Sequence, residues 1–150
     1  RQQPNPALKT WMAGEAKEMF EKALAINPDN DSTKIGLGSC YLFGNISENP
    51  MQGIQMIREV GDRDTTNMFA QFMLGLGGLQ SGQFDKAIER LVKVVAKEPK
   101  NVEAVIALAE SYERKGDKEN AVKWYENSKQ FFTENEILKE IDARIAQLKK

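Results

Sequence analysis

A cluster of glycines comes closest to a chemical motif in this sequence. Gly75, Gly77 and Gly78 stand close together, and glycine-rich loops can hold phosphate groups with their backbone N–H groups. The cluster lacks the Lys and Ser or Thr that end one such motif, and no strand pattern precedes it as the other motif requires. The surrounding residues follow a helical pattern instead. We therefore interpret these glycines as positions where two helices pack closely.

Residue types that carry catalysis or bind metals are scarce. The 150 residues include no histidine, which removes the commonest general base and the commonest neutral metal ligand. Histidine-dependent catalytic triads are therefore excluded. The single cysteine, Cys40, cannot form an internal disulfide, and we expect it to be a small core residue. The carboxylates follow charged helix faces without metal-loop spacing, so we predict a non-enzyme with no cofactor and no metal.

Charge and hydropathy narrow the range of partners. A formal net charge of −1 and a pI near 5.7 give no basic surface for a phosphate backbone, so nucleic acid is not an expected partner. No run of 18 apolar residues occurs, so we expect no membrane insertion of this segment.

The sequence opens at Arg1 without an initiator methionine, and we expect that upstream residues were removed. A cytoplasmic soluble segment is the default expectation, but a signal or anchor could have been removed with those residues.

The sequence repeats itself with a period of 34 residues, the value typical of stacked helix hairpins. Upstream, Leu37 and Gly38 precede Leu74 and Gly75 by 37 residues. From Gly53 onward the spacing is 34 again, which places three extra residues in a loop between residues 42 and 53. The pairs at 34 residues are Leu74 with Leu108, Gly75 with Ala109, Gly82 with Gly116, Ala87 with Ala121, and Leu91 with Tyr125.

Over residues 7–135, this pattern resembles the tetratricopeptide repeat (TPR) family, whose motif runs W-x2-L-G-x2-Y, then A-x3-F, then A and P. Gln71 and Gly78 stand where the family prefers Trp and Tyr, which predicts a thinly packed third unit. The resemblance implies an all-α fold, a right-handed α-α superhelix of about three and a half helix-turn-helix repeats with a C-terminal capping helix. The matching residues are Leu74, Gly75, Gly82, Ala87, Leu91, Val94 and Pro99, then Leu108, Ala109, Tyr112, Gly116, Ala121, Tyr125 and Ser128.

We expect a single domain over residues 1–150. It comprises a partial first repeat (6–30), a repeat with a loop insertion (31–66), two further repeats (67–101 and 102–135) and a capping helix (136–150). Asparagine followed by proline, at Asn5 and again at Asn49, predicts two helix starts. Gly61 is expected to end the second of these helices. The other expected helices are 31–44, 67–81, 84–97, 102–115, 118–131 and 136–150.

In the TPR family, the free faces of the first helices line a concave groove that receives peptides, and the resemblance implies such a groove here. The Lys, Asn and Arg clamp of chaperone-binding members is absent, and Glu103 with Glu110 would repel an acidic chain end. The resemblance therefore implies a non-catalytic protein–protein interaction module that binds an apolar or amphipathic segment. The corresponding groove positions are Ile35, Ser39, Phe43, Phe69, Phe72, Met73, Leu76, Gln80, Glu103, Ile106 and Glu110.

Self-association is the alternative function. The first helix has no preceding hairpin partner, so Leu8, Trp11 and Met12 are expected to be exposed. A repeat stack left open at one end can pair with a second copy and form a homodimer.

The interpretation of the small residues as helix contacts is testable. Replacing Gly75 or Ala87 with Leu should overpack the helix junction and lower the free energy of unfolding by about 1–3 kcal/mol. Thermal melting of each variant beside the parent measures this effect. Melting temperatures equal to that of the parent would contradict the interpretation.

Overall fold

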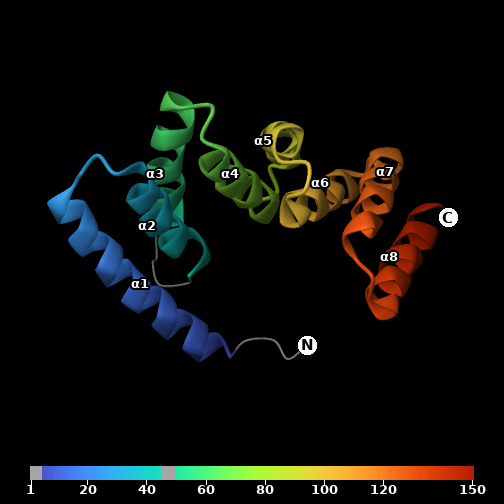
Figure 1. Cartoon of the computed structure of the whole chain (residues 1–150), viewed down its shortest axis with the longest axis horizontal. Coiled ribbons are helices and arrows are strands. Elements are labelled where there is room, and N and C mark those ends of the chain that lie inside the picture. The colour runs from blue at the N-terminus through green and yellow to red at the C-terminus, as the bar shows by residue number, and fades with distance from the viewer. Residues whose placement is uncertain (1–4, 45–49) are drawn as a thin grey trace. The chain divides into compact units, whose positions relative to one another are not determined.

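Helices form the regular structure of this protein, which the computed structural model describes over residues 5–44 and 50–150 (Figure 1). No strand occurs within these two ranges. The predicted all-α repeat fold is therefore confirmed. The elements are α1 (Pro6–Ile26), α2 (Asp31–Phe43), α3 (Pro50–Arg63), α4 (Met68–Gln80), α5 (Phe84–Lys97), α6 (Val102–Lys115), α7 (Lys118–Ser128), the 3-10 turn η1 (Lys129–Phe131) and α8 (Asn135–Leu148).

The helices group into two compact units, Arg1–Leu74 and Gly75–Lys150, and the boundary falls inside α4. The first unit holds α1, α2, α3 and the start of α4. The second holds the end of α4 and all later helices. The organisation of one domain into repeats at residues 30, 66, 101 and 135 stays a prediction.

Asparagine caps start the first helix of successive hairpins. The side-chain oxygen accepts a hydrogen bond from a backbone N–H of the first turn, two residues later at Asn5 and three residues later at the other caps, which satisfies a donor that has no partner inside the helix. The predicted start at Asn5 is confirmed, because Asn5 caps α1 and Pro6 is its first residue. The second expected cap, Asn49, lies outside the described residues. The three repeated contacts are Asn30 with Thr33, Asn67 with Ala70, and Asn101 with Ala104, each at 3.0 Å.

In the first unit, α2 and α3 lie side by side with their backbones in close contact (Figure 1). A Cβ atom added to Gly38 would lie 2.8 Å from the carbonyl oxygen of Gly53, a distance that carbon side chains do not reach. The two glycines therefore bring the helices together, as the small-residue pattern predicted. Apolar side chains then fill the space beside this contact. The core cluster is Ile35, Ile57, Val60 and Ala70, with Leu42, Met73 and Leu74 packed against it.

The predicted helix end at Gly61 is wrong, because α3 continues to Arg63. Gly61 is instead a buried contact point for α4. A Cβ atom there would lie 2.8 Å from Cδ1 of Leu74, and the Gly61 carbonyl accepts a 3.1 Å hydrogen bond from Nε2 of buried Gln71. Glycine at this position therefore reflects close packing and not helix termination.

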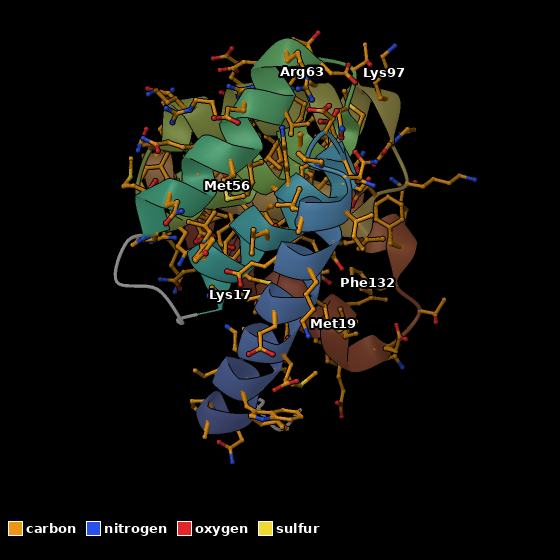
Figure 2. All side chains as sticks on the ribbon, turned by 90° about the vertical axis from the view of Figure 1, so that its left-hand side faces the viewer. Lys17, Met19, Met56, Arg63, Lys97 and Phe132 are labelled. Carbon is orange, nitrogen blue, oxygen red and sulfur yellow. The ribbon has the colours of Figure 1, made fainter. Side chains whose placement is uncertain are left out.

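One face of α1 packs against α2 and the opposite face does not. A Cβ atom at Gly36 would lie 2.6 Å from the Phe20 ring, and one at Gly44 would lie 2.6 Å from Cβ of Ala13. No residue of α1 is buried, and its first turns extend past α2 and α3 in both views (Figure 1 and Figure 2). The apolar residues of α1 are therefore divided between a packed face and a solvent face.

In the second unit, α5 packs against the end of α4 through glycines. A Cβ atom at Gly75 would lie 2.7 Å from Cγ of Leu91, and one at Gly78 would lie 3.1 Å from the backbone nitrogen of Ala87. The missing side chain at Gly78 is thus compensated by a closer approach of the two helices. The turn after α4 uses the left-handed backbone of Gly82, with φ of 79°.

The C-terminal helices close the second unit. Helix α7 ends at Ser128 and continues as the turn η1, whereas the sequence predicted one helix to residue 131. Helix α8 buries Ile145 and turns exposed residues such as Lys139 and Gln147 outward, so it has the two-sided character of a capping helix. The cluster that joins these helices is Ala109, Ala121, Tyr125 and Ile145, with Tyr112, Val122, Trp124, Ile141 and Leu148 packed around it.

A matched pair of glycine substitutions tests the backbone contact. Gly38→Ala should lower the free energy of unfolding by about 1–3 kcal/mol, because the added methyl group meets the Gly53 carbonyl oxygen. Gly14→Ala is the control, because a Cβ atom at Gly14 in α1 meets nothing within 4 Å. It should raise the free energy of unfolding by about 0.5–1 kcal/mol through helix propensity. Urea unfolding of both variants distinguishes the effects, and equal stabilisation by both would contradict the packing argument.

Candidate partner-binding surface

The predicted groove residues of α4 form one stripe along that helix. Phe69, Phe72, Met73 and Leu76 follow the spacing of three, four and seven residues that places side chains on one helical face. Phe69 is 50% exposed, and the other three are partly buried. Gln80 lies one turn beyond them and is exposed. The structure therefore leaves apolar surface of α4 accessible to solvent. We call Phe69, Phe72, Met73 and Leu76 the α4 stripe.

The predicted groove residues of α2 differ in exposure. Ile35 has no exposed surface and belongs to the core of the first unit, because its side chain points toward α3. It therefore cannot contact a partner. Ser39 and Phe43 are partly buried, and the Ser39 hydroxyl donates a 2.7 Å hydrogen bond to the carbonyl of Ile35. Of the predicted groove residues on α2, Ser39 and Phe43 keep surface that a ligand can contact.

Two of the three predicted groove residues on α6, Glu103 and Glu110, carry negative charge. Glu103 is exposed and Ile106 is partly buried. The Glu110 carboxylate lies 3.8 Å from Nη1 of Arg114, an exposed pair that adds little stability. The structure groups these residues on α6 of the second unit. A groove that runs continuously over α2, α4 and α6 stays a prediction.

A depression of about 460 Å³, which sequence reasoning missed, lies in the second unit where the end of α6 meets the start of α5. The Arg114 guanidinium stacks over the Phe84 ring at 5.3 Å, and Lys115 Nζ pairs with Asp85 at 2.6 Å. Neighbouring side chains of α5 therefore already occupy Arg114 and Lys115. No local sequence signal could identify the depression, because its two sides lie about 30 residues apart. Its lining is Gly82, Gln83, Phe84, Asp85, Lys86, Arg114 and Lys115.

The described residues contain no cluster of three acidic, cysteine or histidine side chains able to hold a metal ion. Across the same residues, no helix is long and apolar enough to cross a membrane. Cys40, on α2, is partly buried, and its burial raises the pKa of the thiol. A thiol that stays protonated is a weak nucleophile.

A polar network holds Glu113 of α6, which lies one turn beyond Glu110 along the helix. The Glu113 carboxylate accepts hydrogen bonds from the Tyr125 hydroxyl of α7 at 2.8 Å and from Nε of Arg144 of α8 at 2.9 Å. Burial raises the pKa of Tyr125 well above its usual value, and the adjacent Glu113 carboxylate raises it further. Glu113 therefore joins three helices and is not available to a partner.

Helix hairpins that pack through small residues, with free faces on their first helices, define an α-helical repeat protein. Two family models, both described as Tetratricopeptide repeat, match residues 13–30 and 72–132. These matches cover 79 of the 150 residues. The chain belongs to the tetratricopeptide repeat family.

Solved structures show the same fold. A crystal structure of MamA AMB-1 superposes with a TM-score of 0.78 at 17% identity, covering 93% of this chain and 79% of that one. A second crystal form of MamA AMB-1 gives a TM-score of 0.64 at 25% identity, covering 83% of this chain and 72% of the other. At these sequence identities, the structural similarity shows a shared fold.

A curated relative is the cytochrome c-type biogenesis protein CcmH of Haemophilus influenzae. It is 25% identical over 118 residues, which cover 72% of this chain and 26% of the relative. The chain thus spans about a quarter of the length of this relative. Family and fold together identify the chain as a protein–protein interaction module.

The Tyr125 network makes stability depend on pH. The pKa of Tyr125 is higher in the folded state than its ordinary value of 10.0, so the neutral phenol stabilises the fold below pH 10 and this contribution is lost as the pH rises further. Tyr125→Phe should cost about 1 kcal/mol at pH 7 through the lost hydrogen bond. Chemical unfolding between pH 8 and about 11 should show a steeper loss for the parent than for the variant. Parallel curves would contradict the assignment.

Proposed function

We propose that this module binds an apolar or amphipathic segment of another protein on the α4 stripe. The exposure of Phe69, half of whose surface is open to solvent in a described helix, is the observation that carries the proposal. An amphipathic helix presents apolar side chains at the same spacing of three and four residues, so it can pack along such a stripe. Ser39 and Phe43 of α2, in the same unit as most of the stripe, would extend the contact, as the family's concave groove implies.

Apolar burial limits the strength of this interaction. Covering the four side chains of the α4 stripe contributes about 6–12 kcal/mol, at roughly 1.5–3 kcal/mol for each fully buried side chain. Association costs about 4–15 kcal/mol in lost translational and rotational freedom. Three of the four side chains are already partly buried. The free energy gained by covering them therefore lies near the lower end of this range. Binding in the micromolar range or weaker follows.

A ligand that extends onto the second unit meets the charge of α6. Glu103 is exposed, and the Glu110 side chain keeps 40% of its surface in solvent. Carboxylates at these positions disfavour an acidic ligand or a chain end that presents its own carboxylate. A neutral or basic amphipathic segment is therefore the preferred partner.

A matched pair of charged substitutions tests this function. Peptides selected from a display library on the parent chain should be rich in apolar residues at helical spacing and poor in Asp and Glu. Phe69→Glu should weaken their binding by about tenfold or more, because one apolar contact is replaced by a charge. Val92→Glu is the control, since Val92 on α5 is similarly exposed at 43% and lies outside the stripe.

Isothermal titration measures both affinities, and circular dichroism verifies that each variant stays helical. Equal binding by the parent and Phe69→Glu would refute the assignment of the stripe. Selection of acidic peptides would refute the charge preference.

Self-association through α1 is the second candidate function. The predicted exposure of its first turns is confirmed, with Leu8 at 52%, Trp11 at 63% and Met12 at 57%. Apolar side chains this exposed on one element favour a contact that covers them. We propose that a second copy of the chain provides that cover.

A further inference from the structure

The solvent face of α1 carries a regular stripe of six exposed residues. Successive members are four, three, four, three and four residues apart, which is the spacing of a coiled-coil seam. Met19 and Ile26 are 71% and 86% exposed. Figure 2 shows Met19 on one flank of α1 and Lys17 on the opposite flank, where Lys17 pairs with Glu21 and lies over Tyr41. The stripe, called the outer stripe below, consists of Leu8, Met12, Glu15, Met19, Lys22 and Ile26.

Two opposite charges interrupt the outer stripe. Glu15 and Lys22 are exposed and seven residues apart, so they lie about 10 Å from each other along the helix. Neither has an ion-pair partner among the residues that the structure describes. A surface that covers the stripe must therefore present a positive group to Glu15 and a negative group to Lys22.

A second copy of α1 presents these groups when it runs antiparallel. With a twofold axis near Lys17, Leu8 lies opposite Ile26, Met12 opposite Lys22, and Glu15 opposite Met19 of the other copy. Glu15 and Lys22 of the other copy then lie three residues apart along the axis, about 4.5 Å. Long side chains span that separation. The same symmetry forms the ion pair twice.

A parallel arrangement has the opposite electrostatic result. It places Glu15 beside Glu15 and Lys22 beside Lys22 of the other copy, and like charges at such positions are destabilising. The pattern of charge on the outer stripe therefore discriminates between the two directions.

We propose that the outer stripe is a self-recognition surface, through which two copies of this chain pair by antiparallel packing of α1. This proposal rests on the second candidate function and adds to it the direction and register of the contact. Trp11, which flanks the stripe and is 63% exposed, becomes covered at the edge of the contact. The α4 stripe takes no part, so peptide binding and self-pairing are separate activities.

Charge reversal tests the proposed register. In sedimentation velocity of the full 150-residue chain over a range of concentrations, the parent should form dimers. Glu15→Lys and Lys22→Glu should each weaken the dimer by about tenfold, because each converts two attractive pairs into repulsive ones. An equimolar mixture of these two variants should dimerise as well as the parent, since every cross-pair is then attractive. The double variant should also recover dimerisation.

Glu59→Lys is the matched control, because Glu59 is an exposed glutamate of α3 outside the stripe, and its dimerisation should equal that of the parent. A chain that stays monomeric at all concentrations overturns both the second candidate function and the register. A dimer that Glu15→Lys and Lys22→Glu leave unchanged overturns the antiparallel register alone. Peptide binding by the α4 stripe is unaffected by either result.

Discussion

Backbone contact between paired helices is the constraint on which this structure depends. A hairpin of two short helices cannot bury enough apolar surface unless the helices approach closely, and only glycine or alanine permits that approach. Gly38 against Gly53 and Gly78 against Ala87 provide the contact in the two units. Larger side chains, such as Leu91 against Gly75, then fill the adjoining space. These contacts set the distance between the paired helices, and the other core side chains pack around them.

Hydrogen-bonded side chains add to the apolar contacts that join the helices. Gln71 occupies a position at which the family prefers Trp, and its amide bonds to the carbonyl of Gly61. Glu113 links Tyr125 and Arg144 and thereby ties three helices of the second unit together. Hydrogen bonds have strict geometry, so each contact selects one orientation of its helices, whereas apolar packing alone tolerates several.

Both proposed functions use faces that helix packing leaves open. In a stack of hairpins each helix has a side that no neighbour covers, and on most helices here that side is charged. The α4 stripe and the outer stripe of α1 carry several apolar side chains on such a side, with Phe69 exposed on the first and Leu8, Met12, Met19 and Ile26 exposed on the second. Exposed apolar surface at helical spacing is suited to another helix. Recognition of another protein segment therefore agrees with both surfaces.

The sequence by itself determined the repeat period, the approximate helix positions and the cap at Asn5, because these depend on interactions between residues close along the chain. The family resemblance predicted that residues of α4 line a partner-binding groove. Only the tertiary structure decided that Ile35 is core, that Gly61 is a contact and not a helix end, and that the apolar residues of α1 form two faces. Helical periodicity defines the faces of a helix, but it does not state which face a neighbour covers. That choice depends on contacts between residues distant in the chain, such as Phe20 with Gly36 and Gly61 with Leu74.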